Sequence, residues 1–378
     1  MKQILCLSTS NYYPFPTRKQ NVMNRLSDAE ILYIEPPVTL LAPLKDKGTR
    51  RRLKAYRNPG ERVKDNITVY AQPPVLPFFN KFRFINRINQ RRLAGYLSKI
   101  LDRHGFKKPY LWCYSPTSCD ITKLIENRGV IYDCVDRHSA YPGMINPKVV
   151  DEMEKDLATC SHMVFCTAMG LYETLIEYNE NTKLIPNGAA YHLFSKAGEG
   201  EKKRKDGGPI FGFIGMLQDC IDYNLLASVA DHFPQGEVWL LGKPLPGVDL
   251  KAIEGRSNIR LLGLKPQEEL PEYIREFDVC LNVFREGRLS KDVSPLKFYE
   301  YLATGKPIVS TREPVQVKDF ADVVYIGENE KDFITKCEEA LREDDPNKRK
   351  KRMEYGKACS WDERVREMER ALKEKRIF

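Results

Sequence analysis

Short apolar runs that end in polar, glycine or proline residues recur from one end of the sequence to the other. The runs are KQILCL, AEILYIE, NITVYA, YLWC, GVIYDC, HMVFC and TKLI in the first half, and PIFGFI, EVWLL, IRLLG, DVCLNV and KPIVS in the second. Short runs of this kind are typical of strands that are buried on both faces of a parallel sheet. Helical or long loop segments separate them, so the spacing predicts two doubly wound α/β domains.

A charged, glycine-rich segment, KAGEGEKKRKDGGP at 196–209, separates the two sets of strands. It has no apolar periodicity, which is typical of a connection between domains. We therefore predict an N-terminal domain at 1–190, a linker at 191–208 and a C-terminal domain at 209–355. The strongly helical end of the chain, 356–378, is a separate helix in this division and could pack back on the N-terminal domain.

The ten cysteines are scattered, without a CxxC pair or regular spacing. Because the start of the sequence also lacks a signal-peptide pattern, this favours reduced thiols in a cytoplasmic protein. No apolar run approaches the roughly 18 residues that are needed to span a bilayer. HExxH, Cys–His ligand spacing and DxD elements are all missing, so we expect no metal ion or other cofactor.

Positive charge is concentrated in residues 45–108, which hold 18 Lys or Arg against four Asp or Glu, a net charge of +14 in a chain of formal net charge +9. Aromatic and basic residues interleave in FFNKFRFINRI, residues 78–88, a pattern that suits the interface of an anionic membrane. Nucleic acid would be attracted by the same charge, although no nucleic-acid motif accompanies it. An ordinary basic helix face is the third interpretation.

The segment SPLKFYEYLATGKPIVST, 294–311, predicts a helix followed by a buried strand. Ser294 suits the N-cap, Pro295 the first helical position and Gly305 the left-handed turn that closes the helix. Lys297 then lies at the positive end of the helix dipole, where a cation is unfavourable unless an anion binds there. Glu300 is three residues further on and shares its face, so the alternative is a simple surface Lys–Glu pair.

Several motifs resemble, in the right order, those of glycosyltransferases with the GT-B fold. The segment at 294–310 resembles their donor-binding helix, and LIPNGAAYHLF resembles the PNG segment between their domains. SHMVFCTAMGLYETL and IRLLGLKPQEELPEYIREFDVCLNVF also fit, so the resemblance runs from about residue 130 to the C-terminus. STSNYYPFPTRKQNVMNRL, YIEPP and YDCVDRHSAYPG are similar to the group of teichuronic acid biosynthesis glycosyltransferases.

The resemblance implies two Rossmann-like domains that face each other across a cleft, with a UDP-sugar donor on the C-terminal domain and glucuronate as the sugar. It assigns Lys297 to the diphosphate and Glu300 to the ribose. The other expected donor contacts are Gly215, Met216, Arg285, Ser294, Pro295 and Leu296. Arg288 is a further candidate for the diphosphate charge, and Arg137, Arg285 and Arg288 are candidate partners for a glucuronate carboxylate. Gly212 and Gly215 could equally form only a tight turn. Asp292 stands where many retaining relatives have Glu.

On the acceptor side, Asp136 should follow a strand and remove the proton from the acceptor hydroxyl during an inverting transfer. His138 is the alternative base, or orients the acceptor, and Asp136 as a helix cap is the other alternative. Asp133, inside the strand, should pack or bond locally. Arg18, Lys19 and Arg137 are the candidate contacts to an anionic acceptor, with solvated surface charges as the alternative.

These observations predict a UDP-sugar-dependent glycosyltransferase that works on a membrane-associated or lipid-linked cell-surface glycan at the inner face of the cell membrane. A sugar-nucleotide epimerase is an alternative, because the same fold hosts that chemistry. A non-catalytic protein that binds anionic lipid or nucleic acid through residues 45–108 is the second alternative.

Overall fold

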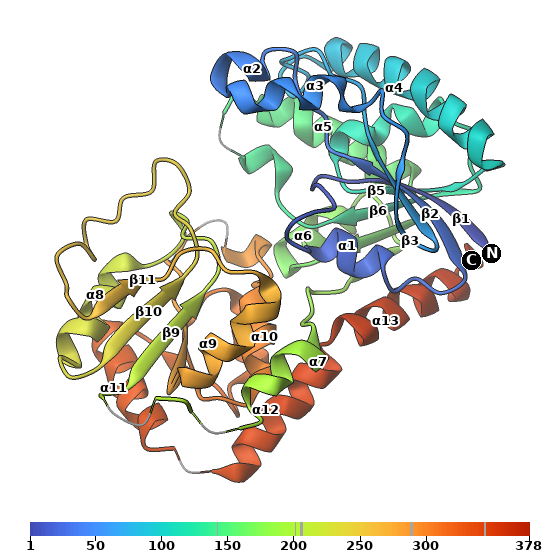
Figure 1. Cartoon of the computed structure of the whole chain (residues 1–378). Coiled ribbons are helices and arrows are strands. Elements are labelled where there is room, and N and C mark those ends of the chain that lie inside the picture. The colour runs from blue at the N-terminus through green and yellow to red at the C-terminus, as the bar shows by residue number, and fades with distance from the viewer. Residues whose placement is uncertain (142, 201, 205–206, 288–289, 344) are drawn as a thin grey trace. The chain divides into compact units, whose positions relative to one another are not determined.

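The computed structural model describes the whole chain except residues 142, 201, 205–206, 288–289 and 344. The chain forms two compact units (Figure 1). The first unit comprises Met1–Pro186 and Val365–Phe378, and the second comprises Asn187–Arg364. Each unit is built around one mainly parallel sheet with helices packed on it, which confirms the prediction of two doubly wound α/β domains.

The first sheet has the strand order β3-β4-β2-β1-β5-β6-β7-β8, and all its neighbours are parallel except β3 and β4. Its strands are β1 Lys2–Leu7, β2 Ala29–Glu35, β3 Glu61–Lys64, β4 Ile67–Ala71, β5 Tyr110–Cys113, β6 Gly129–Cys134, β7 Met163–Cys166 and β8 Thr182–Leu184. Its helices are α1 Arg18–Met23, α2 Ala42–Lys45, α3 Arg52–Ala55, α4 Arg83–His104, α5 Pro147–Cys160 and α6 Met169–Leu175.

The second sheet has the order β11-β10-β9-β12-β13-β14 and is parallel throughout. Its strands are β9 Ile210–Ile214, β10 Glu237–Leu241, β11 Ile259–Leu261, β12 Val279–Asn282, β13 Ile308–Thr311 and β14 Tyr325–Gly327. The helices that follow Pro186 are α7 Tyr191–Phe194, α8 Tyr223–His232, α9 Leu270–Glu276, α10 Leu296–Thr304, α11 Glu330–Leu341, α12 Pro346–Ala358 and α13 Trp361–Glu374.

Each sheet has one point where the strand order reverses. The first strand of each unit, β1 or β9, has the second strand on one side and β5 or β12 on the other. Loops that leave the carboxyl ends of these two neighbouring strands turn in opposite directions, and ligands of open α/β sheets bind in the crevice between them. The loops after β1, β5, β9 and β12 are therefore the places where functional side chains are expected.

The division between the units differs from the one predicted from the sequence. The chain passes from the first unit to the second at 186/187, so the predicted linker at 191–208 belongs to the second unit. Residues 191–194 form α7, and the apolar side chains of Phe194 and Ala197 are buried in the core of that unit. The boundary was misplaced because these few apolar residues precede the charged segment that dominates the local pattern.

The last helix, α13, begins in the second unit, and the residues from Val365 onward belong to the first. Glu369 accepts hydrogen bonds from the backbone and the hydroxyl of Ser27, at 2.8 and 2.6 Å. The ring of Phe378 lies 5.0 Å from that of Tyr110 in β5. The chain's last residues are thus part of the first unit's fold.

None of the helices in the described part of the chain combines the length and the apolar character required to cross a membrane.

Candidate active site

The helix that carries Lys297, α10, starts one residue later than predicted. Its N-cap is Pro295, which has no side-chain group to accept from the first N–H groups, and Leu296 is the first helical residue. Ser294 does not cap the helix, because its hydroxyl accepts from the backbone N–H of Asn187 at 3.1 Å. The prediction of Ser294 as N-cap is therefore wrong. The N-cap residue therefore provides no side-chain cap, and helix starts of this kind are common binding sites for anions.

Lys297 reaches the reversal point of the second sheet. Its ammonium nitrogen lies 3.8 Å from the ring centroid of Phe213 in β9 and 5.0 Å from that of Phe284, which follows β12. Both rings present a surface that attracts a cation. Within the described residues Lys297 forms no ion pair, so the protein provides aromatic faces for this cation and no carboxylate counter-ion.

Two glycines at the end of β9 have different roles. A Cβ atom on Gly215, which has a φ of 121°, would lie 3.1 Å from Cε and 3.3 Å from Nζ of Lys297. The missing side chain therefore leaves room for the ammonium group beside the loop, next to the half-buried Met216. A Cβ atom on Gly212 would lie 2.0 Å from the ring of Phe277, so Gly212 allows close packing and does not face the site.

Glu300 lies one turn along the same helix and is 6% exposed. Gln267 donates its side-chain amide to Oε1 of Glu300 at 3.2 Å. Burial raises the pKa of Glu300 to about 7 and lowers the pKa of Lys297 to about 7, because both groups lose water around their charged forms. An anion beside Lys297 and a diol beside Glu300 would supply the partners that the protein alone does not.

The remaining donor-side candidates lie on the segment after β12. Arg285 is exposed, and its side chain borders a pocket of about 400 Å³ at the carboxyl ends of β12, β13 and β14. Asp292 is 5% exposed, so it is largely enclosed by protein. Arg288 lies outside the described residues.

In the first unit, Arg18 is a structural residue and not an acceptor contact. Its side chain is 2% exposed, and its Nε donates to both carboxylate oxygens of Asp133, at 2.9 and 3.1 Å. Its Nη1 donates to the carbonyls of Ile185 and Pro186. The guanidinium is thus held inside the fold, and the prediction for Arg18 is wrong. Asp133, which was expected to pack or bond locally, is fully buried, but its partner Arg18 comes from a distant part of the sequence.

The neighbouring Lys19 has a different environment. It is 8% exposed, and its ammonium nitrogen lies 5.7 Å from the ring centroid of Tyr114, the residue that follows β5. Among the described residues no carboxylate forms an ion pair with Lys19, and the hydroxyl of Tyr114 has no hydrogen-bond partner. Burial lowers the pKa of Lys19, while Asp136 and Asp133 oppose that shift. A cation thus lies at the reversal point of this sheet as well, and here it is buried.

Asp136 follows β6, as predicted, and accepts a hydrogen bond from the hydroxyl of Tyr141 at 2.8 Å. His138 is buried, and this burial, together with the charge of Lys19, lowers its pKa to about 4. The Nε2 atom of His138 has no partner. Arg137 is directed elsewhere, because its guanidinium donates to the carbonyl of Gly170 and the hydroxyl of Thr174 in α6.

Sequence reasoning missed four side chains that the structure brings to these positions. They are Phe213, Gln267, Tyr114 and Tyr141. Phe213 and Tyr114 look like ordinary strand residues in the sequence, but each stands at the carboxyl end of a strand beside a reversal point. The sequence shows that both residues are near strand ends. Only the strand order of the folded sheet shows that these ends lie at a reversal point.

Comparison with known proteins relates the chain to glycosyltransferases. No family model matches it. It is 27% identical over 250 residues to the "Putative teichuronic acid biosynthesis glycosyltransferase TuaH" of Bacillus subtilis (strain 168), a match that covers 61% of this chain and 63% of that protein. The chain thus covers less than two thirds of that relative's length.

Solved structures match over nearly the whole chain. A trehalose-6-phosphate protein from E. coli bound with UDP-2-fluoro glucose has a TM-score of 0.70 at 12% identity, covering 98% of this chain and 99% of that one. A trehalose-6-phosphate synthase studied for glycosyltransfer with retention also has a TM-score of 0.70 at 12% identity, with 99% of both chains covered. Anabaena Alr3699/HepE in complex with UDP and glucose has a TM-score of 0.63 at 12% identity, again over 99% of both chains. The chain therefore has the GT-B fold, and the predicted resemblance is confirmed.

Proposed function

We propose that the protein is a glycosyltransferase that uses a UDP-sugar donor. The observation that carries this proposal is the ammonium group of Lys297, which lies over Phe213 and Phe284 at the reversal point of the second sheet. A half-buried cation, an uncapped helix start and a glycine turn converge there, and this combination suits a diphosphate. The resemblance to a teichuronic acid biosynthesis glycosyltransferase and to UDP-bound structures of the same fold supports the same choice.

Each residue of this site has a role in the proposal. The free N–H groups at the start of α10 and the ammonium of Lys297 hold the diphosphate, and the carboxylate of Glu300 accepts hydrogen bonds from the ribose hydroxyls. When the bond between the sugar and the diphosphate breaks, UDP leaves with the electron pair. Lys297 then stabilises the charge that develops on the leaving group.

The acceptor hydroxyl requires a group that removes its proton, and we propose Asp136. In an inverting transfer the acceptor oxygen attacks the anomeric carbon, the bond to the diphosphate breaks on the opposite side, and the proton passes to Asp136. Exposure favours Asp136 as the base, because Asp136 is half-buried whereas the Nε2 atom of His138 is buried. Retention, as studied in the trehalose-6-phosphate synthase, is the competing outcome, and the anomeric configuration of the product distinguishes the two.

Glucuronate is the donor sugar that the likeness to the teichuronic acid protein favours. Of the candidate partners for its carboxylate, Arg137 is engaged by α6, whereas Arg285 is exposed beside the end of β12. We therefore propose Arg285 as the contact to a sugar carboxylate. Lys19, buried and without a carboxylate partner, is the proposed contact to an anionic group of the acceptor.

The acceptor is proposed to be membrane-associated or lipid-linked, because neighbouring segments of the first unit combine exposed apolar side chains with cations. The segment around Leu40 runs beside Val75, since the backbone N–H of Leu40 donates to the carbonyl of Val75 at 3.0 Å. The exposed apolar side chains on these neighbouring segments are Leu40, Leu41, Leu44, Phe78, Phe82, Phe84 and Ile88. Leu40, Leu41 and Leu44 lie on and just before α2, and the other four lie on and just before α4, inside the basic window 45–108 (α2 and α4 in Figure 1). An anionic membrane surface fits this combination.

Product formation tests the proposal. The protein is incubated with UDP-glucuronate and UDP-glucose, with and without bacterial membranes as a source of acceptor, and UDP release and radiolabel transfer are measured. We expect acceptor-dependent transfer that is lost in Lys297→Ala and kept in Lys243→Ala, a control that removes an exposed lysine. Conversion of the sugar nucleotide without any acceptor would instead identify an epimerase, and the lack of any turnover would contradict the proposal.

A further inference from the structure

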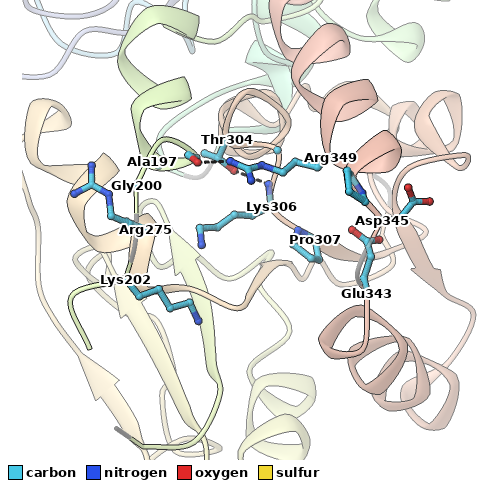
Figure 2. Close-up of a pocket in the computed structure, with 13 residues that line it drawn as sticks. Ala197, Gly200, Lys202, Arg275, Thr304, Lys306, Pro307, Glu343, Asp345 and Arg349 are labelled. Atoms are coloured by element: carbon cyan, nitrogen blue, oxygen red, sulfur yellow. Dashed lines mark hydrogen bonds between the residues drawn. The ribbon is translucent and has the colours of Figure 1, made fainter. Parts of the chain in front are cut away.

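A second group of cations lies at the opposite edge of the second sheet. Lys306 and Pro307 directly precede β13, whereas Gly215 follows β9. Because the strands are parallel, residues before one strand and residues after another lie at opposite edges of the sheet. A pocket of about 300 Å³ opens there (Figure 2). It is separate from the proposed donor site.

Four cationic side chains line this pocket: Lys202, Arg275, Lys306 and Arg349. Lys202 forms an ion pair with Asp278. In the described part of the chain the other three form no ion pair, and each donates a hydrogen bond to a backbone carbonyl instead. The Nε atom of Arg275 is buried and has no partner. Three cations therefore have hydrogen-bond donors that the protein does not use.

In the described part of the chain, the carboxylates that line this pocket already have hydrogen-bond partners. Both oxygens of Glu343 accept from Arg352, at 2.5 and 2.6 Å, and Tyr325 donates to one of them. Asp345 caps α12, with one of its oxygens accepting from two backbone N–H groups. In Figure 2 both carboxylates lie toward the opposite side of the pocket from Lys202 and Arg275. They do not neutralise the unpaired cations.

The end of α10 is the other feature of the protein that could explain these cations. Its last residue is Thr304, and the carboxyl end of a helix attracts positive charge. That end is equivalent to roughly half a negative charge, however, and three unpaired cations face it. Burial is the main cause that lowers the pKa of Lys306; the charges of Lys202 and Arg349 lower it further, whereas Cys280 and Asp278 oppose the shift. The helix end and the carboxylate of Asp278, which is already paired with Lys202, together offset only part of this positive charge.

We propose that this pocket, formed by Arg275, Lys306 and Arg349, binds a small phosphate-bearing anion. A phosphate group offers several acceptor oxygens to the fork of an arginine and to a lysine ammonium at the same time. The volume of about 300 Å³ is sufficient for a phosphate with a small organic group, at the lower end of ligand-site sizes. The site is independent of the proposed transfer reaction and of the donor nucleotide.

The test measures phosphate binding in a background that removes the donor-helix lysine. In full-length Lys297→Ala protein, inorganic phosphate and pyrophosphate are titrated by calorimetry, with chloride held constant. We expect binding that weakens at least about tenfold when Arg349→Gln or Arg275→Gln is added, because each loses a charge-assisted hydrogen bond. Lys350→Gln, which removes an exposed charge from the same helix as Arg349, should leave the dissociation constant unchanged.

Arg349 is exposed, so its replacement should not disturb folding, and the melting temperature without phosphate checks this. Vesicles that contain phosphatidic acid form a second arm. Retention on these vesicles that is lost in Arg349→Gln would identify a lipid headgroup as the source of the phosphate, and phosphate binding without such retention would identify a soluble ligand. Equal phosphate affinity in Arg349→Gln, Arg275→Gln and Lys350→Gln, or no phosphate binding at all, would overturn the proposal.

Discussion

The affinity for UDP should fall with rising pH above pH 8, and Lys297 should be the cause. Burial lowers the pKa of Lys297 to about 7 in the free protein. A bound diphosphate favours the charged form and raises that pKa again, toward the 10.5 of an ordinary lysine. Binding therefore takes up a proton wherever the solution pH lies between the two values. Affinity is fully present below the pKa of the free protein and is lost progressively above it.

The magnitude follows from these two pKa values. With a free value of about 7 and a bound value near 10.5, the dissociation constant of UDP should rise about ninefold from pH 8 to pH 9, about 1.3 kcal/mol. Both the carboxyl of Glu300, with a pKa of about 7, and the terminal phosphate of UDP, with a pKa of about 6, are ionised throughout this range. Of these three groups, Lys297 is therefore the one whose charge changes between pH 8 and pH 9.

Isothermal titration calorimetry in buffers of different ionisation enthalpy measures both the affinity and the number of protons taken up. Lys297→Arg is the matched control, because a guanidinium stays charged at pH 9 and removes the pH dependence even where the new side chain binds UDP less tightly. A change in the ligand itself affects both proteins equally, so the difference in slope is the quantity of interest. The same slope in wild type and Lys297→Arg would refute the reasoning.

Three further predictions concern the first unit. Asp136→Asn should lower the single-turnover rate of transfer at saturating donor by a factor on the order of 10² to 10⁴, while UDP binding stays intact. A normal transfer rate in this variant, together with a loss of transfer in His138→Ala, would identify His138 as the base. Arg18→Leu should lower the free energy of unfolding, measured in urea, by about 3–5 kcal/mol, because it leaves Asp133 charged and buried. A double variant that also carries Asp133→Leu should recover much of this loss. Undiminished stability of Arg18→Leu alone would show that the ion pair is not needed. Phe84→Ser, which removes a 61% exposed ring, should reduce sedimentation with anionic vesicles and leave UDP binding unchanged, whereas unaltered sedimentation would place the membrane contact elsewhere.

Much of the fold was predictable because most strands are short apolar runs with clear ends. The strands that the sequence did not reveal have weak signals for physical reasons. β3, ERVK, is an exposed edge strand with a single half-buried apolar residue, and β14 spans only three residues. Neither has enough buried positions to produce a periodic pattern.

The candidate site was predictable in part, because a helix start is encoded locally and its surroundings are not. Lys297 and Glu300 were singled out from spacing alone, and the structure places both at one end of the sheet. Arg18 and Lys19 are adjacent in sequence and equally charged, yet one is paired with Asp133 and the other has no carboxylate partner among the described residues. Only the tertiary position of Asp133 distinguishes Arg18 from Lys19, and a contact between residues this far apart in the chain cannot be inferred from a single sequence.

The direct test of the central claim is calorimetric titration of UDP into wild-type protein, Lys297→Ala and Glu300→Ala at pH 7.5. UDP should bind the wild-type protein with a measurable dissociation constant. Lys297→Ala should raise that constant about 10- to 150-fold, corresponding to about 1.5–3 kcal/mol for a hydrogen bond to a charged group, and Glu300→Ala should raise it as well. Unchanged UDP affinity in both variants would contradict the account and place the donor site elsewhere.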